Sequence, residues 1–402
     1  MQIFRLKNGL TVVYDRRKTE TVSIQTTVKV GSNNEEKDVF GISHFIEHML
    51  FEGTKKRMSS KIISNEIESL GGQLNAYTSN ERTCFFVKVP KNHFLKALDI
   101  ISDITQNPIF DKKSLEKERK IILKEINLHK DEPRFHQWVL FQKTLFKNLP
   151  TKNPTYGSVK SVKSITRKDM LDYYNKYYLP NNIVLSIVGD VKNIKQNIKK
   201  YFNKFKAKRL PNINSISEPI QNKIEIKKEK RKILNSYMVL GYKTPARLDK
   251  DSYVLDVIRA ILGKGQSGRI FDEIRNKRGL AYEVGVYHEP DNDYGFFAVY
   301  LNTHKKNISK SVKIILDEFK KLEDLTPKEI AEAKGYLEGQ FILDNEDTHD
   351  RADEIGFWAS IKDAKLFDRY LDEIRKVKKT DIIDVAKKYL GKNYALAVIE
   401  QI

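Results

Sequence analysis

Two adjacent stretches near the start of the chain decide the fold: LTVVYDRRKTETVSIQTTVKV at residues 10–30 and VFGISHFIEHML at residues 39–50. The first predicts strands, and the second carries apolar residues at helical spacing. The same order returns in the second half of the chain, as SYMVLGYKT at residues 236–244 and SYVLDVIRAIL at residues 252–262. The sequence therefore indicates two copies of one mixed unit.

The parallel continues through the rest of each half. In both halves a glycine-containing loop with a helix, a pair of strands and a long helix follow in the same order. In the first half they lie at residues 59–72, 74–89 and 110–130. In the second half they lie at residues 267–280, 281–301 and 325–344. A repeat of this length is not a solenoid. We expect an α+β fold with two duplicated domains, each an antiparallel-rich sheet packed with helices.

A polar segment separates the two copies. It reads KAKRLPNINSISEPIQNK at residues 206–223 and contains Pro211 and Pro219, a composition typical of a linker. We therefore predict an N-terminal domain at residues 1–208, a linker at 209–221 and a C-terminal domain at 222–402.

Composition narrows the class of protein. The 402 residues carry 73 Lys and Arg against 53 Asp and Glu, and 73 − 53 gives a net charge of +20. These basic residues are scattered and accompany no nucleic-acid-binding motif, so we expect a solvated lysine-rich surface and no nucleic-acid partner. No apolar run approaches a membrane span and no signal-peptide pattern opens the chain, so we expect no membrane partner and a cytoplasmic location. The single cysteine, Cys84, allows no internal disulfide, and its apolar neighbours predict a strand in the core.

The segment GISHFIEHMLF at residues 41–51 contains candidate metal-binding and catalytic side chains. His44 and His48 are four residues apart, so they share one face of the predicted helix. Two imidazoles one turn apart can bind one zinc ion. Glu47 lies close to the same face and can take a proton from a water on that metal.

Zinc needs a third protein ligand. The long helix predicted at residues 110–130 offers Glu118 and Glu125, which are seven residues apart and lie on one face. From spacing alone, either carboxylate could bind the metal, and the other could orient a ligand from behind.

Four motifs together resemble the pitrilysin and insulinase superfamily of zinc metallopeptidases, whose metal motif is inverted. The closest resemblance is to the short branch that includes mitochondrial processing peptidase and its bacterial relatives. The motifs are HFIEH at 44–48, FEGT at 51–54, GGQLNAYTSNERT at 71–83 and ERKIILKEI at 118–126, and residues 157–191 also look like that branch.

The resemblance implies a role for each site residue. His44, His48 and Glu125 would bind one Zn²⁺ per chain, and Glu47 would be the general base. Glu118 would be the supporting acidic residue of the same helix. The strand at Asn75 and Ala76 would be the edge on which the peptide substrate lies.

The second half has no His-Glu-His motif, but Arg275 and Tyr282 match the spacing of an arginine and tyrosine pair of the family. By resemblance, both would donate hydrogen bonds to the carbonyl oxygen under attack. The family also implies that each chain forms half of a clamshell chamber, and we therefore expect a homodimer.

The sequence thus predicts a zinc-dependent endopeptidase that hydrolyses unstructured peptides or presequences. Two alternatives come from other classes of protein. One is a non-catalytic structural or core-type subunit of the same superfamily, and the other is a basic nucleic-acid-binding protein, which would bind DNA with a strong salt dependence.

Overall fold

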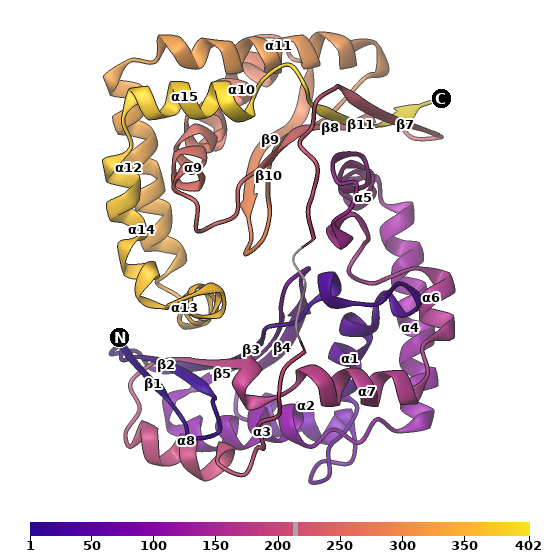
Figure 1. Cartoon of the computed structure of the whole chain (residues 1–402), viewed down its shortest axis with the longest axis vertical. Helices are drawn as coiled ribbons and strands as arrows, with labels where there is room; N and C mark the ends of the chain where they lie inside the picture. Colours follow the sequence, from indigo (N-terminus) through magenta and orange to yellow (C-terminus); the bar gives the residue numbers. More distant parts are fainter. Residues whose placement is uncertain (212–215) are drawn as a thin grey trace. The chain divides into compact units, whose positions relative to one another are not determined.

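The computed structural model describes residues 1–211 and 216–402, and these form two compact units (Figure 1). Residues 212–215 belong to the predicted linker at 209–221, and that part of the prediction lies outside the described residues. Of the described residues, the first unit contains 1–127, 154–211 and 343–368, and the second contains 128–153, 216–342 and 369–402.

The first unit is built on a sheet with the strand order β1-β2-β6-β3-β5-β4. Its neighbours pair antiparallel except β2 and β6, which are parallel. β4 therefore lies at one edge of the sheet. The strands are β1 (Gln2–Arg5), β2 (Thr11–Asp15), β3 (Thr21–Val28), β4 (Gln73–Thr78), β5 (Thr83–Pro90) and β6 (Ile183–Val188).

The second unit repeats this sheet. Its strand order is β7-β11-β8-β10-β9, and again one pair of neighbours, here β7 and β11, is parallel while the others are antiparallel. Taken in this sheet order, the strands correspond to β2, β6, β3, β5 and β4, and β1 is an addition to the first unit. The predicted duplication and the α+β class are confirmed. The strands are β7 (Glu225–Arg231), β8 (Ser236–Thr244), β9 (Ala281–Pro290), β10 (Gly295–Thr303) and β11 (Ala395–Gln401).

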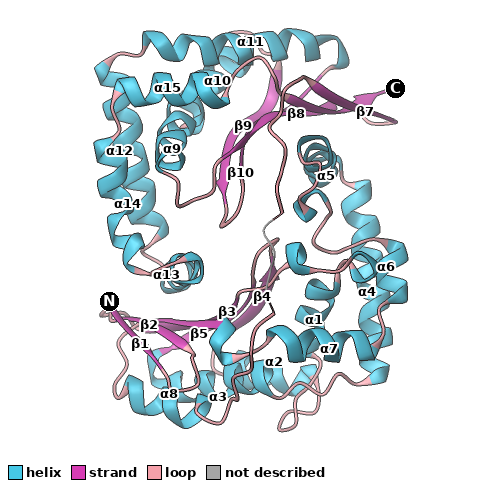
Figure 2. Cartoon of the chain, viewed as in Figure 1, coloured by secondary structure: helices cyan, strands magenta, loops and turns pink. Residues whose placement is uncertain are grey.

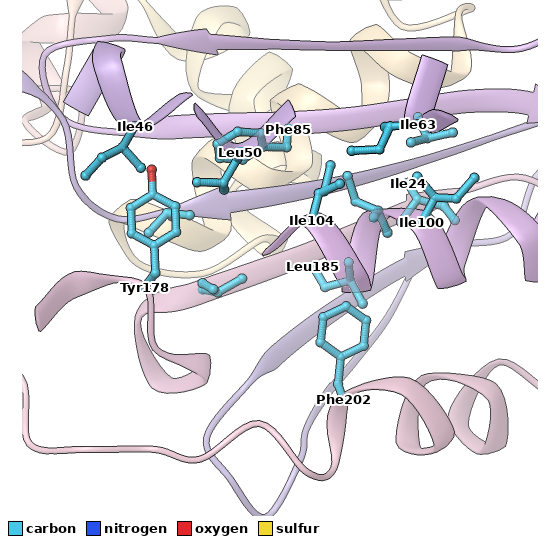
Figure 3. Packing of buried hydrophobic residues seen from close by; sticks show 14 of the residues in the cluster. Ile24, Ile46, Leu50, Ile63, Phe85, Ile100, Ile104, Tyr178, Leu185 and Phe202 are labelled. Atoms are coloured by element: carbon cyan, nitrogen blue, oxygen red, sulfur yellow. The ribbon is translucent and has the colours of Figure 1, made fainter. Parts of the chain in front are cut away.

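Helices cover one face of the first sheet and enclose an apolar core (Figure 3). In Figure 3, Leu50 lies beside Phe85 of β5, and Leu185 of β6 faces Phe202. Cys84 is buried in β5, as predicted. The helices are α1 (Ile42–Phe51), α2 (Ser60–Glu68), α3 (Phe94–Gln106), α4 (Lys112–Asp131), α6 (Val159–Ser164), α7 (Arg167–Tyr177) and α8 (Ile194–Phe202).

The remaining helices are α5 (Pro133–Leu145), α9 (Lys250–Gly263), α10 (Arg269–Phe271), α11 (Ile308–Lys320), α12 (Pro327–Asp344), α13 (Thr348–Ile361), α14 (Lys365–Lys376) and α15 (Lys379–Tyr389). Most of them pack in the second unit. No helix in the described part of the chain combines the length and the apolar character that crossing a bilayer requires.

Each half of the chain lends one helix to the sheet of the other half (Figure 2). α5 follows the long helix of the first half and packs on β8 and β11 of the second unit. α13 follows the long helix of the second half and packs on β3 and β6 of the first unit. The compact units therefore do not coincide with residues 1–208 and 222–402, and those boundaries remain a prediction about the sequence repeat.

The two exchanged helices meet different surfaces. α5 packs through apolar side chains, including Leu140 and Phe141, against Val239 and Ala397 of its sheet. α13 instead meets a row of buried polar side chains on the sheet of the first unit, among them Ser23, Gln25, Thr27 and Ser186. Polar bonds therefore contribute strongly to how α13 is held.

Candidate active site

The start of α1 is fixed by a buried carboxyl group. Glu35 accepts hydrogen bonds from the backbone N–H groups of Gly41 at 2.7 Å and Ser43 at 2.9 Å. These are two of the N–H groups that a helix leaves unpaired at its first turn. Gly41 has a φ of +93°, and a β-carbon there would lie 2.7 Å from the carbonyl oxygen of Tyr156. Both features favour glycine at this position.

Burial of one face of α1 directs the other face to the site. Ile42, Phe45, Ile46, Met49 and Leu50 are buried in the core of the first unit. The side chains between them, His44, Glu47 and His48, therefore emerge on the opposite side of the helix.

α4 supplies the two carboxylates that face these histidines. Glu125 lies 3.6 Å from Nε2 of His44 through one oxygen and 3.8 Å from Nε2 of His48 through the other. Glu118 lies on the other side of His48, where its Oε2 is 3.0 Å from Nδ1. Both glutamates therefore reach the site, but only Glu125 approaches both imidazoles on the same side.

These side chains fit a zinc ion by their chemistry and spacing. One ligand atom each from His44, His48 and Glu125 lie within 4.8 Å of one another. Zinc bonds to nitrogen and oxygen of about 2.0–2.1 Å in a tetrahedral arrangement place ligand atoms roughly 3.4 Å apart. Two imidazoles and one carboxylate also leave a fourth position open, as in catalytic zinc sites.

Glu118 lies beside Nδ1 of His48 and is itself largely buried. It is 6% exposed and also pairs with Nζ of Lys117 at 3.2 Å. Burial opposes ionisation, but the hydrogen bonds from His48 and Lys117 outweigh it and lower the pKa of Glu118. A carboxylate in this place holds the proton of His48 on Nδ1 and leaves Nε2 available as a ligand.

The side chain of Glu47 projects from α1 towards the edge strand β4. Its Oε2 accepts a hydrogen bond of 2.6 Å from the hydroxyl of Thr78 on β4. Burial raises the pKa of Glu47, and the bond from Thr78 opposes that shift only in part. A carboxylate with a raised pKa is better suited to accept a proton than an exposed one.

The predicted substrate strand is the free edge of the first sheet. Within the described residues, β4 pairs with β5 alone, and Asn75 is exposed while Ala76 is half-buried. An edge strand offers unpaired N–H and C=O groups that an extended peptide can join.

Arg275 and Tyr282 lie together in the second unit. Arg275 belongs to a π-helical turn, Asp272–Asn276, and Tyr282 is the second residue of β9. The guanidinium carbon of Arg275 lies 4.7 Å from the centre of the Tyr282 ring, and Tyr282 is 78% exposed. The pair is therefore preformed on the surface of its unit.

A second group of candidate ligands has a structural explanation. Asp347, His349 and Asp350 have ligand atoms close enough together for a metal ion. Asp347, however, caps α13 by accepting the N–H of His349, and its other oxygen pairs with Lys88. Its carboxylate is thus already used.

The chain belongs to peptidase family M16. Residues 11–159 match the family described as insulinase (peptidase family M16), and residues 164–337 match the M16 inactive domain. The inactive-domain match covers the part of the chain without a His-Glu-His motif, whereas the first match contains His44, Glu47, His48 and Glu125. Membership of the pitrilysin and insulinase superfamily is therefore confirmed.

Individual relatives match along their whole length. An uncharacterized zinc protease of Rickettsia felis is 32% identical over 99% of this chain and 97% of its own. One of Bacillus subtilis is 29% identical over 98% of this chain and 97% of its own. Among solved structures, a protease from Helicobacter pylori has a TM-score of 0.94 at 25% identity and covers 99% of both chains. A peptidase M16 inactive domain from Pseudomonas fluorescens has a TM-score of 0.88 at 21% identity, with 100% of this chain and 98% of its own covered, and shows the same fold.

Sequence reasoning missed Thr78 and Glu35. Thr78 lies within the quoted stretch at 71–83, and the two-residue period of a strand places it on the same face as Ala76. Its partner Glu47 is 31 residues away, so no local pattern marks the bond. Glu35 precedes the helix by too many residues to be recognised as an ordinary cap.

Proposed function

We propose that this chain is a zinc-dependent endopeptidase that hydrolyses unstructured peptides or presequences. The observation that carries the proposal is the approach of Glu125 to Nε2 of both His44 and His48, beside the carboxylate of Glu47. The names of its relatives, which call them zinc proteases, support the same class of reaction.

His44, His48 and Glu125 would hold one zinc ion per chain. When bound, zinc lowers the pKa of a coordinated water and polarises a carbonyl group. Glu118 keeps His48 in the ligand-competent tautomer through its bond to Nδ1.

Glu47 moves the proton. It accepts one from the attacking water and then delivers it to the nitrogen of the departing amine. The hydroxyl of Thr78 holds one carboxylate oxygen of Glu47, so the other can face the substrate. The raised pKa of Glu47 suits a group that must both take and return a proton.

The substrate would lie along β4 as an added strand. Main-chain hydrogen bonds at Asn75 and Ala76 would bind any extended peptide with little regard to its side chains. A folded protein has few free extended segments to offer, which accounts for a preference for unstructured peptides.

We further propose that the enzyme is a homodimer in which Arg275 and Tyr282 of one chain act at the zinc site of the other. The exposure of Tyr282 and its stacking with Arg275 support a role outside the core of the second unit. Both side chains can donate hydrogen bonds to the oxygen of the scissile carbonyl as it becomes negative.

The test measures metal content and cleavage together. The purified protein should contain about one zinc ion per chain, and chelation should abolish cleavage of an unstructured peptide, with activity restored by added zinc. Glu47→Gln should keep its zinc and lose about 10²–10⁴ in rate. Full activity after chelation, or in the Glu47→Gln variant, would reject the proposal in favour of another mechanism. A fully metallated but inactive wild-type chain would favour a non-catalytic subunit.

A further inference from the structure

The two faces of the edge strand β4 meet different parts of the first unit. Leu74 and Ala76 pack against the apolar core, and Thr78 bonds Glu47 on that side. Tyr77 alternates with them and points to the opposite face of the sheet, as the two-residue period of a strand requires. Among the strands of the described residues, β4 pairs with β5 alone, so side-chain bonds matter more for its position than they do for a central strand.

The hydroxyl of Tyr77 meets α13, a helix from the far end of the chain. It donates a hydrogen bond of 2.5 Å to Oδ1 of Asp353, a residue 276 positions away. Nε2 of Gln25 donates to the same oxygen at 2.6 Å, and Nε of Arg82 donates to the Tyr77 hydroxyl at 3.1 Å. Asp353 therefore joins the edge strand to the centre of the sheet.

α13 is itself held firmly enough to serve as an anchor. Oγ1 of Thr348 lies 2.8 Å from Oγ of Ser23, and Arg351 pairs with Asp15 at 2.5 Å. Gly356 approaches the sheet so closely that a β-carbon there would lie 3.0 Å from Oγ of Ser186. These contacts fix the rotation and the register of α13 on the sheet, and so the position of Asp353.

The side chains of the adjacent residues Tyr77 and Thr78 thus form hydrogen bonds on opposite faces of β4. Thr78 binds the proposed general base, and Tyr77 binds Asp353, while the substrate edge at Asn75 and Ala76 begins one residue away. If β4 shifts, a peptide that pairs with it loses hydrogen-bond geometry and binds more weakly. The placement of β4 relative to Glu47 is therefore a quantity that the enzyme must control.

We propose that Asp353 is a positioning residue that fixes the substrate edge β4 relative to Glu47. The proposal rests on the function proposed above and deepens it. It assigns part of peptide binding to α13, a helix from the half of the chain that lacks the metal motif.

The test combines kinetics with hydrogen exchange. Asp353→Ala removes the acceptor, Tyr77→Phe removes the donor, and Asp353→Asn keeps an acceptor oxygen. Asp350→Ala is the matched control, because Asp350 lies one turn earlier on α13 and is exposed. We expect Asp353→Ala and Tyr77→Phe each to raise KM for an unstructured peptide roughly tenfold, the scale of one lost bond to a charged group, with kcat and zinc content much less affected. Asp353→Asn should recover most of the affinity.

Hydrogen exchange measures the local stability of β4 and does not depend on peptidase activity. Amides of residues 73–78 should exchange roughly tenfold faster in Asp353→Ala and Tyr77→Phe than in wild type, and those of β3 and β6 should not change. At residues 73–78 the effects of the two changes should be less than additive in the double variant, because both remove the bond between Tyr77 and Asp353.

Three results would overturn the inference. One is unchanged KM and unchanged exchange at residues 73–78 in folded variants. Another is equal acceleration across the whole sheet, which indicates a general structural role. The third is an equal effect from Asp350→Ala. A wild-type chain without peptidase activity would refute the proposed function instead, and the exchange data would still decide whether Asp353 fixes β4.

Discussion

Replacing Glu118 by glutamine tests whether this residue binds the metal or orients a residue that does. Glu118 is buried and lies 3.0 Å from Nδ1 of His48, while Glu125 faces Nε2 of both His44 and His48. Glu118→Gln leaves all three predicted ligands in place and removes only the charge behind His48. Glu125→Gln removes a ligand itself.

The size of the effect follows from the bond that is lost. A hydrogen bond to a buried charged group contributes about 1.5–3 kcal/mol. If that free energy supports the ligand-competent tautomer of His48, its loss weakens zinc binding roughly 10- to 100-fold. Glu125→Gln should weaken zinc binding further than that, because a neutral amide is a poorer ligand than a carboxylate.

The assay is competition for zinc with a chromophoric chelator at fixed pH, with melting temperature recorded in parallel. Glu116→Gln is the matched control, since Glu116 lies on the same helix with 62% of its side chain exposed and pairs with Arg119. It should bind zinc as the wild type does. If Glu118→Gln empties the site and Glu125→Gln does not, the ligand assignment is reversed. If Glu118→Gln binds zinc normally, the orienting role of Glu118 is refuted.

Two further predictions concern Glu35 and the proposed dimer. Burial raises the pKa of Glu35 from 4.5 to about 8, so the folded chain holds this proton more tightly than the unfolded chain. Relative to Glu35→Gln, the wild type should therefore lose stability as pH rises from about 4.5 to about 8, by up to about 1.4 kcal/mol per pH unit, in denaturant titrations; a difference that is constant across this range contradicts the shift. For the dimer, Tyr282→Phe homodimers should lose about 10²–10³ in rate. Co-expression of the Tyr282→Phe and Glu47→Gln chains should then return about a quarter of wild-type activity, because half of the dimers are mixed and each of these has one intact site. No recovery, with mixed dimers verified by mass, argues against a shared site.

The helix that carries the metal motif could be predicted because its information is local. Apolar residues at helical spacing predict one buried face, and the same spacing places His44 and His48 together on the other. The duplication was equally visible, since each half repeats the same order of patterns and each forms a sheet of the same strand order. The helix is predicted by residues close together in sequence, and the duplication is predicted by a pattern that recurs along the chain.

The choice between Glu118 and Glu125 shows where spacing stops being informative. Both residues lie on one face of α4, and the periodicity of a helix treats them alike. The family resemblance implies Glu125 as the ligand, and the structure places the two glutamates on different nitrogens of His48. Glu125 reaches Nε2 of both histidines, and Glu118 reaches Nδ1 of His48.

The amino-acid sequence by itself determined the class of fold, the repeat and the histidine pair, because each follows from the spacing of residues within short segments and from the order of those segments. Only the tertiary structure decided that α13 belongs with the sheet of the first unit, that Thr78 holds Glu47 and that Asp353 holds Tyr77. These partners are 31 and 276 residues apart. Which polar groups meet across such separations depends on how strands and helices pack, and no local pattern of residues encodes that packing.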